Sequence, residues 1–257
     1  VIVLFVTEDQ KRKYLSLAVS GDIIFSYALT EPQTGSDAQN IQTTATESED
    51  GRHFILNGTK AYITNANYAG GLTVFAQLDA DKPGFMGAFI VETAWDGVTI
   101  GKDMPKMGLK ASSTAAIQFQ DVKVPKENLL GPRGHGFHQM MQTLDGGRLS
   151  IGAMGLGGAQ GCFDMAIKYT NEREQFGRPI ATFQANAFKL ADMAMEIECA
   201  RLLLYKACWL RDNDLPFSKE AAMGKLYCSE LMYRCANHAV QLHGGYGLMK
   251  EYDVERF

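Results

Sequence analysis

The stretch FHQMMQTLDGGRLSIGAMGLGGAQGCFDMAIKYTNERE, residues 137–174, is rich in Met, Leu, Ala and Gly and contains no proline. A run of this length without a helix breaker predicts one helix of about ten turns. Residues 183–212 and 216–243 also predict long helices. The last of these has Pro and Ser near its start and two glycines after its end, which are typical helix boundaries. In the middle one, apolar residues share one face: Leu190, Ala194, Ile197, Leu204 and Cys208. Three long helices with short links predict most of an antiparallel bundle.

The chain ahead of the first long helix, from residue 25 to about residue 130, has the pattern of short strands. The runs TVFAQL, GAFIVE and TAAIQFQDVKVP are rich in β-formers and are separated by Gly, Pro and Asp. In HFILNGTKAYIT, residues 53–64, Asn57-Gly58 stands between two such runs. Both residues tolerate the positive φ of a type I′ turn, so the pair predicts a hairpin. Several short strands with turns between them predict a small antiparallel barrel or two packed sheets.

The predicted fold is α+β and has three parts. Residues 1–24 contain an amphipathic helix in TEDQKRKYLSLAVSGD, with Tyr14, Leu15 and Ala18 facing inward. Residues 25–131 form the β domain, and residues 132–257 form the helical bundle. The chain does not begin with Met, and both its first helix and its bundle need further partners. We therefore expect the sequence to be a piece of a longer protein.

Composition narrows the classes of function. The 257 residues are 46% hydrophobic and 21% charged, which suits a globular protein with a real core. A net charge of -4 and a pI near 5.8 leave no basic footprint, so nucleic acid and anionic membranes are poor candidates for the main partner. The five cysteines lie in the second half without a Cys-x-x-Cys pair or a His cluster. They predict reduced, buried thiols in a reducing compartment, and no metal site is expected.

Five motifs are candidates for chemistry, and each has a structural alternative. TEPQTGSD, residues 30–37, is either a surface turn or one wall of a ligand site. In NEREQFGRP, residues 171–179, a cation suits a helix C-terminus, but a guanidinium also suits pyrophosphate. LDGGR, residues 144–148, places two glycines inside a helix, and HGGYG, residues 243–247, exposes amides that end a helix or receive a phosphate. GLGGAQG, residues 155–161, follows no strand, so its glycines predict close helix packing rather than dinucleotide binding.

Taken in order, the motifs resemble the acyl-CoA dehydrogenase family, in particular its short-chain or butyryl-CoA members. The matching blocks run from about residue 25 to the last residue and are YALTEPQTGSDA, NGTKAYITNA, MPKMGLKASST, FQDVKVPKENLLG, TLDGGR, NEREQFGRPI, FQANAFKLADMAMEIECARLL and QLHGGYG. The resemblance implies an N-terminal helical domain, a middle β domain, a C-terminal four-helix bundle, non-covalent FAD and usually a homotetramer. Residues 1 to about 22 match the last helix of the first domain, so we expect most of that domain and the C-terminal end to be missing.

The resemblance also implies site residues. Positions that contact the flavin and its pyrophosphate are matched by Tyr27, Leu29, Thr30, Gly35, Ser36, Tyr62, Ile63 and Thr64. Tyr62 replaces the Trp that many members carry, and Tyr27, Leu29 and Thr30 would meet the ring through backbone and hydroxyl groups. Positions that reach the FAD of a neighbouring subunit are matched by Arg173, Gln175, Phe176, Gln241, Gly244 and Gly245. Positions along the acyl-CoA site are matched by Ser36, Asp145 and Arg148.

The implied reaction is FAD-dependent α,β-dehydrogenation of an acyl-CoA thioester to the trans-2-enoyl-CoA, as in fatty acid β-oxidation. Electrons would pass to an electron-transfer flavoprotein. A carboxylate removes the α-proton, and most members carry that Glu beyond the position of Phe257. A minority carry it at the position of Gly147, and Glu251 and Glu255 match no base position. We therefore expect no catalytic residue in this sequence, and little activity or FAD retention from the piece alone.

Two other interpretations stay open. An acyl-CoA oxidase has a similar fold, and a non-catalytic flavin-binding or acyl-CoA-binding subunit would lack the base. The expected partners are an acyl-CoA, an electron-transfer flavoprotein and further copies of the chain, arranged as a dimer of dimers, with no nucleic acid and no membrane. The expected compartment is the bacterial cytoplasm or the mitochondrial matrix.

Overall fold

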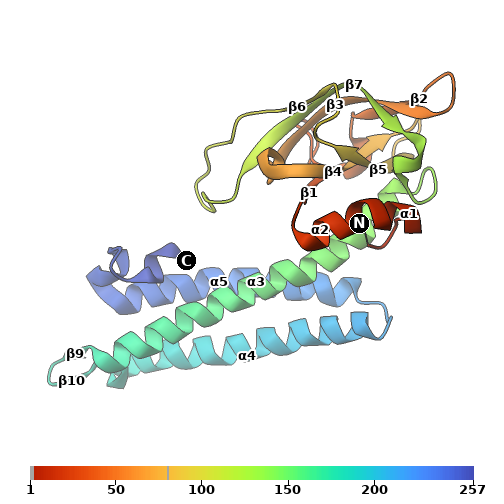
Figure 1. Ribbon diagram of the computed structural model, residues 1–257. Coiled ribbons are helices and arrows are strands. Elements are labelled where there is room, and N and C mark those ends of the chain that lie inside the picture. The colour runs from red at the N-terminus through yellow and green to blue at the C-terminus, as the bar shows by residue number, and fades with distance from the viewer. Residues whose placement is uncertain (1–2, 80) are drawn as a thin grey trace. The chain divides into compact units, whose positions relative to one another are not determined.

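The computed structural model describes residues 3–79 and 81–257 (Figure 1). Two compact units can be distinguished, Val1–Gln142 with the strands and Thr143–Phe257 with the long helices, and each has its own hydrophobic core. Residues 1 and 2 of the predicted N-terminal part lie outside the described residues. The domain boundaries expected after residues 24 and 131 stay predictions. Within the described ranges, no helix combines the length and apolar character needed to cross a bilayer.

A short helical segment in the first unit begins at a capping box. α1 (Glu8–Gln10) continues through a π-helical turn (Lys11–Leu15) into α2 (Ser16–Ser20). Thr7 Oγ1 accepts a hydrogen bond from the Gln10 amide at 3.3 Å, and Gln10 Oε1 accepts one from the Thr7 amide at 2.8 Å. The Tyr14 side chain is buried, and its hydroxyl donates to Glu92 at 2.8 Å. The inward direction predicted for Tyr14 is confirmed, while Leu15 and Ala18 are half-buried.

Eight strands of the first unit form one sheet. In chain order they are β1 (Ile24–Ala28), β2 (Thr44–Glu47), β3 (His53–Thr64), β4 (Ala69–Gln77), β5 (Met86–Glu92), β6 (Val98–Ile100), β7 (Thr114–Pro125) and β8 (Leu129–Leu130). The order across the sheet is β6-β7-β3-β2-β4-β5-β8, with β1 beside β4. β1 and β2 both pair with β4 in parallel, whereas the other pairings are antiparallel. The sheet is therefore mixed: most pairings are antiparallel as expected, but β1 and β2 run parallel to β4, which the alternation of side chains could not reveal because it carries no information on strand direction.

Asn57-Gly58 does not form the predicted hairpin. β3 passes through both residues, and its register with β7 shifts between the pairs Leu56↔Val122 and Gly58↔Phe119. The Asn57 side chain exchanges two hydrogen bonds with Asp121, of 3.0 and 2.8 Å. Gly58 has a φ of 149°, and a Cβ at this position would lie 2.5 Å from Thr43 Oγ1. β3 continues through the pair, and the extra residue of the bulge lies on β7, which advances three residues from Val122 to Phe119 while β3 advances two from Leu56 to Gly58. Pairing within the sheet thus overrides the local preference for a turn.

Three long helices dominate the second unit, and they lie side by side (Figure 1). They are α3 (Gly136–Glu172), whose first residues belong to the first unit, α4 (Gln184–Asp212) and α5 (Ser218–His243). The strands β9 (Glu174–Gln175) and β10 (Arg178–Pro179) form a small hairpin between α3 and α4. The 3₁₀ turns Gly244–Leu248 and Asp253–Arg256 follow α5. The predicted helices are confirmed to within two residues at each end.

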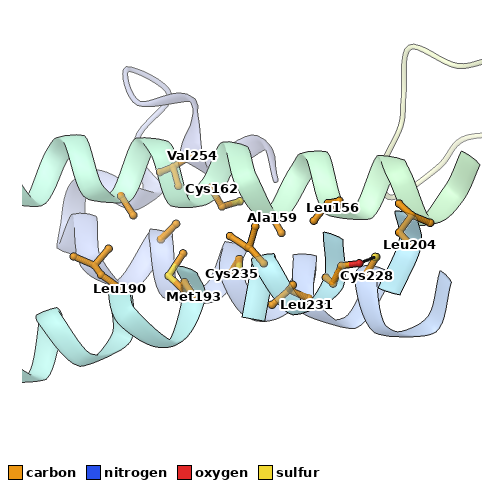
Figure 2. Packing of buried hydrophobic residues seen from close by; sticks show 14 of the residues in the cluster. Leu156, Ala159, Cys162, Leu190, Met193, Leu204, Cys228, Leu231, Cys235 and Val254 are labelled. Atoms are coloured by element: carbon orange, nitrogen blue, oxygen red, sulfur yellow. Dashed lines mark hydrogen bonds between the residues drawn. The ribbon is translucent and has the colours of Figure 1, made fainter. Parts of the chain in front are cut away.

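Small residues allow α3 and α5 to approach closely in the core of the second unit (Figure 2). A Cβ added at Gly155 would lie 2.9 Å from the backbone carbonyl carbon of Cys228. A Cβ at Gly158 would lie 2.7 Å from the sulfur of Met232. The interpretation of GLGGAQG as a packing motif is therefore confirmed for Gly155 and Gly158, whereas Gly157 is exposed. On α4, the predicted face is buried at Leu190, Ile197 and Leu204 and half-buried at Ala194 and Cys208.

All five cysteines are free thiols, but they differ in burial. Burial raises the pKa of Cys162 to about 12 and that of Cys235 to about 11. Cys228 is buried too, whereas Cys199 is exposed. The prediction that all five are buried was wrong for Cys199, which stands between the buried α4 positions Ile197 and Ala200 on the turn that faces solvent.

Candidate functional site

The segment TEPQTGSD begins with a tight turn that is fastened to β3. The Glu31 amide donates to Thr34 O at 2.9 Å, and the Thr34 amide donates to Glu31 O at 3.1 Å. The Ala61 amide of β3 donates to Thr30 O at 2.8 Å. Beyond this turn Gly35 and Ser36 are exposed, so their backbone groups are open to a ligand.

A buried ion pair lies beneath this turn. Lys60 Nζ is 2.8 Å from Glu31 Oε1, and the two side chains are 0% and 1% exposed. Burial raises the pKa of Glu31, but attraction to Lys60 and hydrogen bonds from Lys60, Thr43 and Gln42 together lower this pKa below its usual 4.5. Burial lowers the pKa of Lys60 to about 8 against the attraction of Glu31. Both groups are therefore charged at pH 7, and each is the counter-ion of the other.

Tyr62 lies at a bulge of β3 itself. The register with β7 passes from Lys60↔Ile117 to Ile63↔Ala115, and Tyr62 adopts a positive φ of 59°. A bulge residue in this conformation turns its side chain away from the regular alternation, and the Tyr62 side chain is 66% exposed. Thr64 is exposed as well, whereas Ile63 is buried. Tyr62 and Thr64 thus present side chains to a ligand, and Ile63 presents only its backbone.

The Tyr27 side chain is half-buried with its hydroxyl inside the unit, and the Leu29 side chain is buried. The Tyr27 ring packs against Phe75 at a centroid distance of 5.2 Å. The hydroxyl oxygen of Tyr27 is buried and has no hydrogen-bond partner among the described residues. Burial raises the pKa of Tyr27, so this hydroxyl stays protonated. Leu29 is buried, and its carbonyl accepts a hydrogen bond from Lys60 Nζ at 3.0 Å.

A pocket of about 510 Å³ opens in the second unit, where α3 and α5 end. Five of the six residues predicted for the second half of the cofactor site lie together there, and Phe176 does not. The pocket is lined by Tyr169, Arg173, Gln175, Ile180, Asn186, Gln241, Leu242, His243, Gly244, Gly245, Tyr246 and Met249. Phe176 stands at the tip of the β9–β10 hairpin, and its side chain is 93% exposed.

Glycine conformations and ring stacking shape this pocket. Gly244 ends α5 with a positive φ of 59°, and Gly244 and Gly245 are exposed. His243 is buried and stacks on Tyr169 at a centroid distance of 4.2 Å. The Arg173 guanidinium lies 5.9 Å from the centre of the Tyr246 ring. The guanidinium, the three carboxamides of the lining and the glycine amides form a donor set that suits phosphate, and the rings provide an apolar wall.

Two of the three residues predicted near the acyl-CoA, Asp145 and Arg148, are bonded to each other. Asp145 forms an ion pair with Arg148 one turn later on α3, and it accepts a hydrogen bond from Ser218 at the start of α5. The side chains of Asp145 and Arg148 are 16% and 33% exposed. Asp145 thus orients Arg148, which keeps enough exposure to bind an anion. Glu251 and Glu255 are exposed.

Reasoning from the sequence missed the Lys60–Glu31 pair and the aromatic lining of the pocket. A signal for the pair exists in HFILNGTKAYIT. Phe54, Leu56 and Gly58 alternate on one face of the predicted strand, and Lys60 occupies the next position on that face. A lysine on a buried face needs a buried acid, because lysines are almost never fully buried unless they are paired.

Acid is expected to destabilise the first unit. Hydrogen bonds and ion pairs outweigh the effect of burial and hold the pKa values of Glu31 and Glu92 below 4.5, and hydrogen bonds from Thr114 and Ser113 hold that of Asp103 below 3.8. The unfolded chain therefore binds protons first as the pH falls, and the free energy of unfolding decreases below about pH 4.5. Urea titrations of a Trp209→Phe variant, with Trp95 as the reporter, would measure this. Equal midpoints at about pH 6 and about pH 3.5 would contradict the prediction.

Comparisons with known proteins agree with the order of the motifs. The family model described as "Acyl-CoA dehydrogenase, middle domain" matches residues 26–122, and "Acyl-CoA dehydrogenase, C-terminal domain" matches residues 134–257. The probable acyl-CoA dehydrogenase YngJ of Bacillus subtilis is 49% identical and is covered over 66% of its length by 98% of this chain. The caffeyl-CoA reductase-Etf complex subunit CarC of Acetobacterium woodii is 48% identical, with 66% of it covered by 97% of this chain. The chain thus spans just under two thirds of the length of these relatives.

A solved structure gives the same result for the fold. The butyryl-CoA dehydrogenase of Megasphaera elsdenii has a TM-score of 0.96 to this chain and is 45% identical. The match covers 99% of this chain and 67% of that one. Fold, motif order and identity at this level agree over nearly all residues, and the chain therefore belongs to the acyl-CoA dehydrogenase family.

Proposed function

We propose that the protein containing this chain is an FAD-dependent acyl-CoA dehydrogenase that converts a short-chain acyl-CoA thioester to the trans-2-enoyl-CoA. The observation that carries the proposal is the pocket in which residues 173–175 and 241–245 meet. Its guanidinium, carboxamides and glycine amides suit the phosphates of a dinucleotide. Family membership and the similarity to a butyryl-CoA dehydrogenase support the reaction and the short acyl chain.

Each unit contributes its own cofactor-binding groups. In the first unit, the backbone of residues 27–30, the open amides of Gly35 and Ser36, and the Tyr62 and Thr64 side chains hold and cover the flavin. In the second unit, Arg173 and Gly244-Gly245 bind phosphate groups. These residues would hold FAD, which would supply the hydride acceptor for the β-hydrogen of the acyl group. Phe176, exposed at its hairpin tip, is assigned to the FAD of a neighbouring subunit together with the pocket residues.

The acyl-CoA is assigned to Ser36, Asp145 and Arg148. Arg148 binds an anionic or carbonyl oxygen of the substrate, and Asp145 holds its guanidinium in place. The α-proton needs a carboxylate base and a carbonyl oxygen stabilised by hydrogen bonds. We assign no residue of this chain to the base.

The proposed partners follow from the same assignment. Electrons leave to an electron-transfer flavoprotein, and the name of the relative CarC, a subunit of an Etf complex, supports this partner. The pocket residues of the second unit bind the FAD of a neighbouring copy of the chain, so two copies form a dimer. Two such dimers form the proposed homotetramer. The proposed compartment is the bacterial cytoplasm or the mitochondrial matrix. The naming of CarC as a reductase favours a second candidate, in which the reaction runs in reverse and an enoyl-CoA is reduced to the acyl-CoA with hydride from reduced flavin and a proton.

The test uses the full-length protein and compares variants of two arginines, Arg173 and Arg178, which lie in or next to the β9–β10 hairpin. We expect about one FAD per chain. For a dehydrogenase, butyryl-CoA should bleach the oxidised flavin. For a reductase, crotonyl-CoA should reoxidise the reduced flavin at a higher rate than butyryl-CoA bleaches the oxidised one. Arg173→Ala removes a charged donor and is expected to weaken FAD binding about tenfold or more. The matched control is Arg178→Ala, because Arg178 does not line the pocket and instead lies over the Phe183 ring at 4.3 Å. Protein without flavin, or equal affinities of both variants, would overturn the proposal.

A further inference from the structure

The Lys60–Glu31 pair lies at the point where three segments of the first unit meet. Lys60 belongs to β3, Glu31 belongs to the segment after β1, and Gln42 and Thr43 precede β2. The pair is inaccessible, since its two side chains are 0% and 1% exposed. Neither residue can therefore touch a ligand, and any effect on a ligand must act through the backbone they hold.

The Glu31 carboxylate is bonded on both of its oxygens. Oε1 accepts from Lys60 Nζ at 2.8 Å, from the Thr43 amide at 3.0 Å and from the Thr43 hydroxyl at 2.5 Å. Oε2 accepts from the Gln42 amide at 2.6 Å and from Gln33 Nε2 at 3.0 Å. One carboxylate thus joins the start of the segment 30–37 to the chain that returns from it at residues 42 and 43.

Lys60 holds the entry of the same segment. Its ammonium donates to Leu29 O at 3.0 Å, and the next amide of β3, that of Ala61, donates to Thr30 O at 2.8 Å. Lys60 therefore holds the start of the loop directly, through the Leu29 carbonyl, and holds the returning chain at residues 42 and 43 through Glu31. Between these ends the loop exposes Gly35, Ser36 and Asp37.

Stability alone does not call for an ion pair in this place. Moving two charges out of water is unfavourable, and apolar side chains of similar volume often replace a buried ion pair with equal or greater stability. What apolar side chains cannot do is bind the Leu29 carbonyl and the Gln42 and Thr43 amides in fixed directions. The pair is therefore better explained by the backbone geometry that it imposes than by the free energy of folding.

We propose that Lys60 and Glu31 are positioning residues that hold the loop of residues 30–37 in the conformation that receives the flavin. In its flavin part this inference rests on the proposed function. The loop is expected to lose order, and the flavin to lose affinity, when the pair is removed without leaving an unpaired charge.

The decisive variant replaces both charges by uncharged side chains of similar size, Lys60→Met with Glu31→Gln. In the full-length protein without flavin, we expect hydrogen exchange at the Gln42 amide to accelerate about tenfold or more, because the neutral carboxamide keeps a single acceptor oxygen in place of the two charged oxygens that bind Gln42 and Thr43. We expect the dissociation constant for FAD to rise about tenfold or more, with a shift of the melting temperature of about 5 °C or less. The fluorescence of added FAD measures the affinity.

The matched control removes an exposed ion pair of the same unit, Lys126→Met with Glu47→Gln. The Lys126 and Glu47 side chains are 57% and 29% exposed and 2.7 Å apart. Neither exchange at Gln42 nor FAD affinity should change. A second variant, Thr43→Val, keeps the ion pair and removes one hydrogen bond to Glu31. It should change both quantities in the same direction by a smaller factor, and it decides the question if the double variant does not fold.

The outcomes separate this inference from the proposed function. Unchanged exchange at Gln42 in both variants, or unchanged FAD affinity beside accelerated exchange, would overturn the positioning role. A parent protein that binds no FAD would overturn the proposed function, and with it the role of the pair in flavin binding. If the variants of such a parent protein still show accelerated hydrogen exchange at Gln42, only the role of the pair in holding the loop would remain supported.

Discussion

Lys60→Met is expected to lower the free energy of unfolding by about 3–5 kcal/mol. The substitution leaves the Glu31 carboxylate buried without its counter-ion, 1% exposed and out of reach of water. The Leu29 carbonyl also loses the ammonium that donates to it at 3.0 Å. Urea titrations at neutral pH, with Trp95 as the reporter in a Trp209→Phe background, would measure the loss.

The control for this prediction is Lys126→Met. Lys126 pairs with Glu47 at the surface, and Glu47 retains Arg133 at 2.8 Å after the substitution. Exposed pairs are screened by water, so the free energy of unfolding should be nearly unchanged. Adding Glu31→Gln to Lys60→Met should recover part of the loss, because no unpaired charge remains. Equal effects of Lys60→Met and Lys126→Met would contradict the account of the buried pair.

Gly155→Leu is expected to lower the free energy of unfolding of the second unit by about 3 kcal/mol. Gly155 is buried where α3 meets α5, and even a Cβ would lie 2.9 Å from the backbone carbonyl carbon and oxygen of Cys228. A backbone cannot move aside as the end of a flexible side chain can, so the two helices would have to separate. The packing around this contact is shown in Figure 2.

Gly157→Leu is the matched control on the same helix. Gly157 is exposed, and a Cβ at this position meets no heavy atom of the described residues within 4 Å. Leu has a better helix propensity than Gly, so this variant should gain up to about 1 kcal/mol. Thermal and urea unfolding followed by circular dichroism at 222 nm would compare the two variants. The same sign of effect at both positions would mean that close packing does not explain Gly155.

The candidate site was predictable from the sequence to different extents in its two parts. The order of the motifs singled out Arg173, Gln175, Phe176, Gln241, Gly244 and Gly245, and the structure brings all of these except Phe176 to one pocket. This convergence agrees with an antiparallel bundle, because the first and third helices then run in the same direction and end together. The polar groups beneath the segment 30–37 were not predictable in the same way. Glu31 and Lys60 are 29 residues apart in the sequence, and no local pattern predicts that they pair.

The sequence by itself determined the long helices of the second unit, the strand-rich first unit and the family. These features follow from patterns that act within a few residues or from the order of motifs along the chain. Only the tertiary structure decided that Asn57-Gly58 lies within β3 opposite a bulge of β7, that β1 and β2 run parallel to β4, and that Lys60 is buried against Glu31. Strand pairing and charge burial depend on segments that are distant in the sequence, and their energies override the local preference of a turn or a charged side chain.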